Sequence, residues 1–317
     1  MSTVYFVLQQ AIGCMVPLMI VAIGCMFSEK SGVMNIGLEG LMLVGAFTGI
    51  IFIHLVQAVS DAQWVLILAL LVAGGFGMLF SLLHAYASIN LNADQVISGT
   101  AINLLIPAAG IVIARAVFGV LQIGYNNTFR IAEVPVLSKI PFIGEILFKK
   151  TFITTYIGFG IVIVAAIVMN KTKFGMRLKA CGEHPQAADS VGINVKKMRY
   201  MGVLLSGLLA GVGGLAFILP SATEYSGTVS GYGYLAMAVV IFGHWKSSRI
   251  VFASFFFGLV KTLGAVYTGI PFLLNSGINS YVFKMAPYVA TLIVLAISSK
   301  KTRGPAALGQ IYDKGAR

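Results

Sequence analysis

The sequence predicts an all-α, polytopic membrane protein, and three observations support that fold class. Hydrophobic residues make up 58% of the 317-residue chain and charged residues only 10%, with a mean hydropathy of +0.92. Apolar stretches of roughly 20 residues, enough to cross a bilayer as a helix, recur along the chain. These stretches lack the strict polar and apolar alternation of barrel strands, and backbone groups in lipid must be paired, so we expect membrane-spanning helices.

We expect about nine spans, within a range of about eight to ten, in one membrane domain covering residues 1–299. The seventh stretch is short for a full crossing, so it is either half of a broken helix or extends into residues 227–231. The expected spans lie near residues 8–27, 36–56, 64–88, 95–118, 152–170, 200–220, 232–243, 250–270 and 281–298.

The net charge of +12 is concentrated in two segments. Residues 171–199 hold seven cations against two acids, and residues 300–317 hold five cations against one acid. Short loops rich in Lys and Arg face the cytoplasm, so we expect a cytoplasmic loop at 171–199 and a cytoplasmic basic tail at 300–317. Counting spans backward places the N-terminus and residues 119–151 outside. Membrane topology explains the charge, so we expect membrane lipid, and no nucleic acid, as a partner.

Residues that carry chemistry in enzymes are sparse in this chain. Cys14, Cys25 and Cys181 form no CxxC pair, and the four histidines are scattered without an HExxH spacing. The string GHWKSS at residues 243–248 lacks the second glycine of a phosphate-binding loop. We therefore expect no catalytic residue, metal site or cofactor, and any ATP hydrolysis must belong to another chain.

The stretch EKSGVMNIGLEGLMLVGA at residues 29–46 places two acids, an asparagine and four glycines in apolar sequence. Glu39 is the unusual residue, because a carboxylate at hydrocarbon depth must face a cavity or a partner. Glu29 and Lys30 are expected to stay hydrated at the cytoplasmic surface. Asn35 and Glu39 are therefore candidate residues of a substrate pathway, at a break in a membrane helix.

Gln95 and Asn103 lie in another apolar stretch and are further candidates for the substrate pathway. Their amide groups offer donors and acceptors to an uncharged, hydroxyl-bearing solute. Amides also bond neighbouring membrane helices to each other, and that purely structural interpretation stays open for both residues.

Two other features of the apolar sequence need an explanation. Lys261 lies in the middle of an expected span and requires a partner or water, and Glu39 is one possible partner. The glycine-broken segments 32–40 and 227–233 precede helices that are expected to cross in opposite directions, as in an inverted repeat around a pathway. Plain helix packing by small residues is the alternative.

The loop at residues 171–199 contains the signals of a short helix. Pro185 is suited to the first helical turn and Gly192 to its end. Ala187, Ala188 and Val191 would then share a small apolar face that a partner protein could bury. The alternative is a solvated, positively charged loop without a docking role.

Four stretches of the chain match motifs that occur in the same order in one transporter family. GEHPQAADSVGIN at residues 182–194 is similar to the pattern G-E-N-P-x-A-A-x-x-x-G-I-N, with His184 in place of asparagine. The stretch from Glu29 is similar to E-R-x-G-x-x-N-[IL]-G-x-E-G-x-M, with Lys30 in place of arginine. NADQVISGTAINLL and GYGYLAMAVVIFGHW, at residues 92–105 and 231–245, resemble two further segments. The chain thus resembles permeases of ABC importers in the branched-chain amino acid, simple sugar and nucleoside group.

This resemblance implies a type II-like importer permease, most similar to the smaller permease of a nucleoside importer in the bacterial cell membrane. It implies three partners: a second permease in a heterodimer, a cytoplasmic ATP-binding subunit and an extracytoplasmic substrate-binding lipoprotein. The short loop helix would contact the ATPase and couple its closure to the membrane helices. The coupling residues implied in this way are Gly182, Glu183, Ala187, Ala188, Asp189, Gly192 and Ile193.

Other functions remain as alternatives at this point. Simple sugars are the second choice of substrate. A proton-coupled secondary carrier, with Glu39 or Asp94 as the proton site, is a different class of protein and would need no docking helix in the loop. An ion channel is disfavoured, because the sequence contains no ring-forming filter segment.

Overall fold

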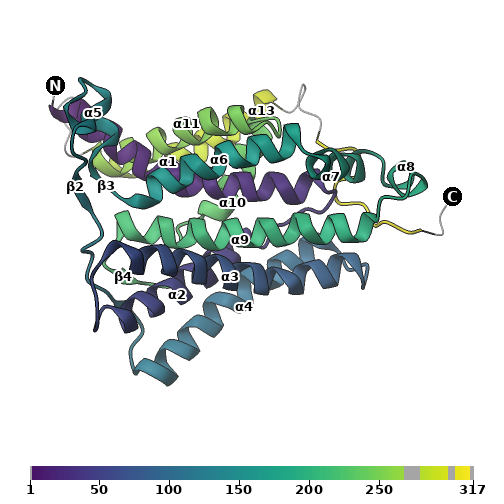
Figure 1. Cartoon of the computed structure of the whole chain (residues 1–317), viewed down its shortest axis with the longest axis horizontal. Coiled ribbons are helices and arrows are strands. Elements are labelled where there is room, and N and C mark those ends of the chain that lie inside the picture. Colours follow the sequence, from purple (N-terminus) through teal and green to yellow (C-terminus); the bar gives the residue numbers. More distant parts are fainter. Residues whose placement is uncertain (1, 268–278, 299–303, 315–317) are drawn as a thin grey trace.

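Long apolar helices run side by side through the computed structural model, which describes residues 2–267, 279–298 and 304–314 (Figure 1). Seven helices in these residues are long and apolar enough to cross a membrane, and each matches a predicted span. They are α1 (Ser2–Lys30), α2 (Leu38–Val56), α3 (Gln63–Ile89), α4 (Gln95–Ile113) with its π-helical extension (Ala114–Phe118), α6 (Ile153–Lys171), α9 (Val195–Ser221) and α11 (Ser247–Val266).

Two further helices correspond to the remaining predicted spans. α10 (Tyr232–Phe242) has 11 residues. At about 1.5 Å per residue it measures about 17 Å, roughly half of a bilayer core. It is therefore a half-helix, and its extension through residues 227–231 is wrong because Gly231, at φ +75°, caps its start. α13 (Ser280–Ser298) is the last helix, and a count of nine full crossings is not confirmed.

The two ends of the helical body carry different structures (Figure 1). One end holds α7 (Lys173–Glu183), α8 (Pro185–Ser190) and the C-terminal residues. The opposite end holds the N-terminus and the segment before α6, as the predicted topology requires. That segment contains β1 (Ile123–Gly124), β2 (Ile131–Glu133), a 3-10 turn (Leu137–Lys139), α5 (Ile143–Leu147) and β3 (Lys149–Thr151). β1 pairs antiparallel with β4 (Glu224–Tyr225), and β2 with β3.

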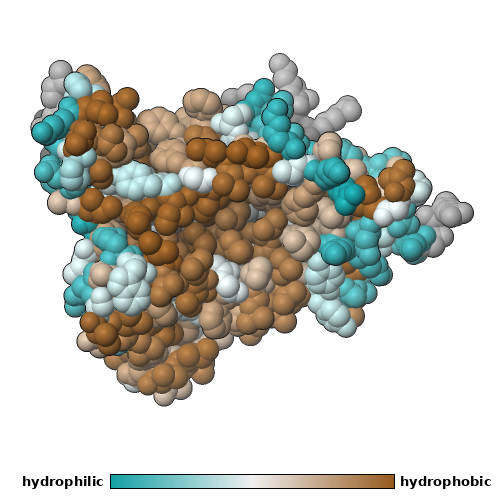
Figure 2. Space-filling view, viewed as in Figure 1, coloured by the Kyte–Doolittle hydropathy of each residue, from teal (hydrophilic) through white to brown (hydrophobic). Residues whose placement is uncertain are grey.

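α9 lies in the interior of the helical body and contacts α1, α2 and α3. Glycines make this close approach possible. A Cβ at Gly211 would lie 2.2 Å from the Ala73 carbonyl oxygen of α3, and one at Gly214 would lie 1.9 Å from the Met42 carbonyl oxygen of α2. The three helices therefore pack backbone against backbone, as small residues permit in membrane proteins. The outer face in Figure 2 is largely apolar, with polar residues gathered at the two ends.

Two irregular segments lead into the helices α2 and α10. Residues 31–37 follow α1, turn at Gly32 with φ +94°, and deliver the chain to the start of α2. Residues 226–231 follow β4 and end at Gly231. Backbone that is not helical must be paired within the protein at membrane depth. These two segments therefore identify the region where polar partners are concentrated.

Residues 304–314 form an irregular segment that packs against the α7 end of the body. The Ala307 N–H donates to the Gly182 carbonyl at 2.9 Å, and the Gly309 N–H donates to the Gly32 carbonyl at 3.1 Å. The described part of the predicted basic tail thus contacts both α7 and the break between α1 and α2.

Candidate functional site

Glu39 lies where two helices begin. Its own helix, α2, starts at Leu38, and α10 starts at Tyr232. Its carboxylate accepts a hydrogen bond from the Gly231 N–H at 2.8 Å and another from the Gly233 N–H at 2.7 Å. A helix N-terminus presents unpaired N–H groups and a partial positive charge, which a carboxylate satisfies. Glu39 thereby joins the first turn of α2 to the first turn of α10.

Asn103 of α4 reaches the same region and is 9% exposed. Its Oδ1 accepts from the Gly40 N–H at 2.8 Å, while Nδ2 donates to the Ile36 carbonyl at 2.9 Å and to the Tyr234 hydroxyl at 3.0 Å. One side chain therefore bonds α4 to the start of α2 and to α10. These contacts match the interhelical interpretation of Asn103, and its contact with a solute stays a prediction.

Buried polar side chains hold the segment between α1 and α2. Gln95 Oε1 accepts from the Met34 N–H at 2.7 Å, and a ring nitrogen of His84 lies 2.9 Å from the Met34 carbonyl. Asn35 Nδ2 donates to the Ser206 hydroxyl of α9 at 3.0 Å. Asn35 is 0% and Gln95 is 6% exposed. Both amides bond the break to neighbouring helices, while their role in a substrate pathway stays a prediction.

Lys261 of α11 does not pair with Glu39 within 4.0 Å in the part of the chain that the structure describes. Its ammonium group donates to the Ser230 carbonyl at 3.0 Å and lies 4.2 Å from the centre of the Tyr232 ring. A carbonyl and an aromatic face are thus the contacts of Lys261, in place of the Glu39 carboxylate that was one possible partner. Lys261 and Tyr234 line a cavity of about 330 Å³ between α10, α11 and α13.

Glu29 is buried, with 3% exposure, so the expectation that it stays hydrated is wrong. The Trp245 indole N–H donates to its carboxylate, and the Cys25 thiol lies 3.4 Å away. The cause is the turn between α10 and α11, which places Trp245 over the end of α1. Lys30 is half-buried, with its ammonium 4.0 Å from a carboxylate oxygen of Glu183.

α8 is the short loop helix that the sequence predicts between Gly182 and Gly192. Pro185 occupies its first turn, and the His184 ring nitrogen Nδ1 accepts from the Ala187 N–H at 3.3 Å as the helix cap. Gly192 follows the helix with φ +83°. His184 thus fills the capping position where the family pattern has asparagine, a common capping residue.

The predicted coupling residues differ in exposure. Ala188 is 3% exposed, and a Cβ at Gly182 would lie 2.3 Å from the Lys30 carbonyl oxygen, so both residues face the protein interior. Val191, next to α8, is 74% exposed. The other predicted coupling residues are exposed or half-buried, namely Glu183, Ala187, Asp189, Gly192 and Ile193.

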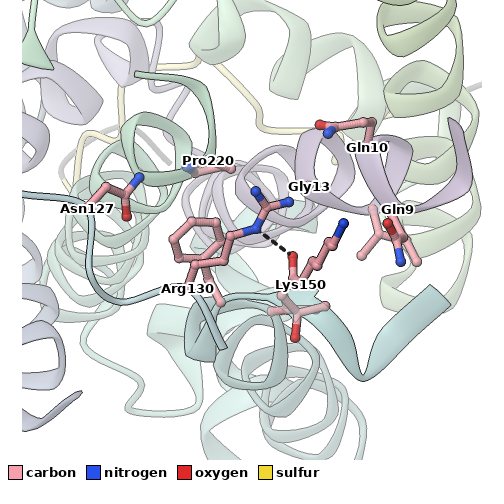
Figure 3. Close-up of a pocket in the computed structure, with 11 residues that line it drawn as sticks. Gln9, Gln10, Gly13, Asn127, Arg130, Lys150 and Pro220 are labelled. Carbon is pink, nitrogen blue, oxygen red and sulfur yellow. Dashed lines mark hydrogen bonds between the residues drawn. The ribbon is translucent and has the colours of Figure 1, made fainter. Parts of the chain in front are cut away.

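A polar cavity of about 210 Å³ lies beside the N-terminal part of α1, at the end of the body opposite α8 (Figures 1 and 3). The Arg130 guanidinium lines it and donates to the Lys150 carbonyl at 3.1 Å. Gln9 and Gln10 enter from α1, and Asn127 lies on the other side of the cavity. In the residues that the structure describes, no group of three or more His, Cys, Asp or Glu side chains could hold a metal ion.

The sequence patterns did not identify Tyr234 and Trp245, which contact Asn103 and Glu29, or the buried position of Arg199. Tyr234 and Trp245 both lie in the stretch GYGYLAMAVVIFGHW, which was recognisable only as a motif. Arg199 counted as a loop charge, but it is 1% exposed and donates to the Gln310 carbonyl at 2.8 Å. Each of these contacts joins residues distant in sequence, so no local pattern identifies it.

These features define a class of protein. The chain is a helical protein with several apolar helices long enough to cross a membrane. It has a broken helix, polar groups within the helical body and an exposed helix pair at one end. This combination is typical of a transport permease. The comparison with known families makes the class specific. The chain belongs to the family of branched-chain amino acid transport system permease components, which matches residues 7–296.

Curated relatives cover nearly the whole chain. The nucleoside ABC transporter permease protein NupC of Lactococcus lactis is 41% identical over 94% of this chain and 93% of its own length. The guanosine ABC transporter permease protein NupQ of Bacillus subtilis is 39% identical over 95% and 94%. The putative glucose ABC transporter permease protein TsgC13 of Haloferax volcanii is 31% identical over 94% of each chain. The same Lactococcus strain has a second nucleoside permease protein, NupB, which is 22% identical to this chain over 94% of its length and 83% of NupB.

Proposed function

We propose that this chain is a permease subunit of an ABC importer for nucleosides. The observation that carries the proposal is the identity of about 40% to two permeases named for nucleoside and guanosine transport, over nearly the full length of all chains. The chain would form part of the translocation pathway, while a separate subunit hydrolyses ATP. Membership of a permease family favours this function over a proton-coupled carrier, and Asp94 has a structural role as the cap of α4.

We infer three partners and a bacterial plasma-membrane location. A second permease is supported by the relatives, because the strain that has NupC also has the more distant permease NupB. A cytoplasmic ATP-binding subunit and an extracytoplasmic binding lipoprotein complete the proposed importer. Its exposed contact with the ATPase would comprise α8 and the turn that follows it.

We propose that the coupling contact is formed by Ala187, Asp189, Gly192 and Ile193, together with Val191. The support is that Ala187, Val191 and Gly192 are exposed, with Asp189 and Ile193 half-buried, in and just after a short capped helix. Gly182 and Ala188 would act indirectly, by seating α7 and α8 on the body. Replacing Val191 with Asp should reduce ATPase co-purification and transport-coupled ATP hydrolysis, whereas Met176→Asp, also exposed but on α7, should not. Equal retention of the ATPase by both variants would contradict the contact.

We propose that the substrate pathway passes the start of α10. Glu39 and Asn103 position this helix start, and Tyr234 and Lys261 line the adjacent cavity of about 330 Å³. A tyrosine offers an apolar ring and a hydroxyl, which suits a solute with an aromatic base and a hydroxylated sugar. Asn35 and Gln95 would support the pathway by fixing the break before α2.

Uptake competition tests the substrate class. Cells that contain the complete importer should take up labelled nucleoside, and excess unlabelled nucleoside should abolish that uptake, whereas excess ribose or glucose should not. The glucose permease relative makes simple sugars the alternative. Loss of uptake with a sugar competitor alone would overturn the nucleoside assignment in favour of that alternative.

A further inference from the structure

A cationic cavity lies at the α7 end, and none of the residues proposed for the substrate pathway lines it. It measures about 340 Å³ and lies between α1, α6, α7 and the turn from α10 to α11. Lys30, Lys179 and Lys246 line it, so three separate elements each contribute one ammonium group.

Little negative charge offsets these lysines. Lys30 lies 4.0 Å from a Glu183 oxygen, and that Glu183 side chain is 54% exposed. Lys179 donates to the neutral Asn170 side chain at 3.0 Å. Across the described ranges, neither Lys179 nor Lys246 forms an ion pair. Several cations around one concave site favour a bound anion.

Neutral donors surround the same cavity. Ser247 and Ser248 line it at the start of α11. The Ser247 hydroxyl donates to the Met26 sulfur at 3.8 Å, and Lys246, the N-cap residue, gives no side-chain hydrogen bond to the helix. The first backbone N–H groups of α11 therefore lack a side-chain cap and can donate to an anion. The neighbouring Glu29 carboxylate accepts from the indole of Trp245 and is withdrawn from the cavity into the protein.

An apolar surface leads to this cavity along α6. Ile163 and Ile167 are 61% and 52% exposed, and Asn170, which lines the cavity, follows them on the same helix face. Figure 2 shows apolar surface along the helical body giving way to polar surface at the α7 end. An acyl chain can lie on such a stripe while its headgroup reaches the lysines. A free phosphate ion would make no use of the stripe.

We propose that this cavity binds the phosphate of an anionic phospholipid headgroup. Lys30, Lys179 and Lys246 hold the phosphate, and the exposed stripe of α6 takes an acyl chain. The bound lipid bridges α7, which carries α8, and the turn between α10 and α11. Basic pockets between membrane helices are a recognised form of headgroup site.

Lipid binding to the purified importer complex tests the proposal. The complex, in detergent, receives phosphatidylglycerol, phosphatidylcholine or inorganic phosphate, and retained lipid is counted by native mass spectrometry alongside thermal stability. We expect the double variant Lys179→Gln with Lys246→Gln to bind phosphatidylglycerol on the order of 20-fold more weakly. The control, Lys173→Gln with Arg177→Gln, removes two charges from exposed positions of α7 outside the cavity and should bind as the unmodified protein does.

Three outcomes would overturn the lipid assignment. Equal weakening by the control pair would mean diffuse attraction to the charged end of the molecule. An equal gain in thermal stability with inorganic phosphate and with phosphatidylglycerol would assign the cavity to a phosphate ion. Equal retention of phosphatidylcholine and phosphatidylglycerol would remove the need for the lysines. A further variant, Lys179→Arg with Lys246→Arg, keeps the charge and should keep selective phosphatidylglycerol binding, which separates loss of the site from misfolding.

Discussion

Replacing Glu39 with glutamine tests whether its carboxylate joins α2 to α10. The carboxylate accepts two backbone hydrogen bonds, at 2.8 and 2.7 Å. A glutamine oxygen can accept one of them, but the amide nitrogen then faces the second donor. The change removes one charge-assisted bond, about 1.5–3 kcal/mol, and the favourable charge at the helix start, about 0.3–1 kcal/mol. The contact should weaken by about 2–4 kcal/mol, roughly 30- to 800-fold in an equilibrium.

Nucleoside uptake by the assembled importer, normalised to the amount of the chain in the membrane, measures the effect. We expect Glu39→Gln to transport at less than about a tenth of the original rate, since about 1.4 kcal/mol already corresponds to tenfold. Glu39→Asp keeps the charge on a shorter side chain, so its uptake rate should lie between those of the original protein and Glu39→Gln. The control, Glu133→Gln, changes an exposed acid in β2, at the end of the body opposite α8, and should not change uptake. Wild-type uptake by Glu39→Gln at wild-type abundance would refute the role of the carboxylate.

Three further predictions concern packing, capping and reactivity. Gly214→Ala should prevent accumulation of folded protein, because its Cβ would lie 1.9 Å from a carbonyl oxygen of α2, whereas Gly160→Ala on α6 meets open space and should accumulate normally. His184→Asn should keep transport, because asparagine caps helices well, and His184→Ala should weaken α8 by about 1 kcal/mol, read as reduced co-purification of the ATPase; equal behaviour of both variants would contradict the cap. Burial raises the pKa of the Cys181 thiol to about 11, against an ordinary value of about 8.5. The native protein should therefore react with maleimide at pH 8 at least 100-fold more slowly than the unfolded chain at this residue, because only the thiolate reacts and its fraction grows as pH rises toward the pKa. Comparable rates would contradict its burial.

Local signals in the sequence predicted the seven long apolar helices, their order and the short helix α8. The span near residues 95–118 agrees with α4 and its π-helical extension, because Asp94 is a strong N-cap and accepts from the N–H groups of Val96 and Ile97. Pro185 and Gly192 likewise bracket α8. These signals work because a helix end is decided by residues within a few positions of it.

The contacts of the ionisable residues could not be predicted in this way. Glu39 bonds to Gly231, which is 192 residues away, and Glu29 bonds to Trp245, which is 216 residues away. Charge pairing suggested Glu39 for Lys261, but a backbone carbonyl and a tyrosine ring take that place. Sequence could show that these groups need partners at membrane depth. Only the tertiary arrangement of the helices determines which partners they meet.

The exposure of α8 also could not be predicted from the local sequence. The sequence placed Ala187, Ala188 and Val191 on one apolar face, but Ala188 faces the interior while Val191 is 74% exposed. α8 has only six residues, so the way it rests on α7 and α9 decides which side points outward. The helical period predicts which residues share a face of a helix. It does not predict whether that face points toward the protein or toward solvent.

The backbone contacts of α9 have a mechanical consequence for transport. At Gly211 and Gly214 the backbones of these helices touch directly, so at those two points no side chain could change rotamer to allow sliding. α2, α3 and α9 should therefore move as one rigid block. Any alternation between inward-open and outward-open shapes must then take place at the edges of that block, where Gly231 and the positive-φ turn at His244 and Trp245 connect α10 to its neighbours. We therefore expect α10 to move against this block during transport, while the hydrogen bonds from Gly231 and Gly233 to Glu39 join α10 to the block in the present structure.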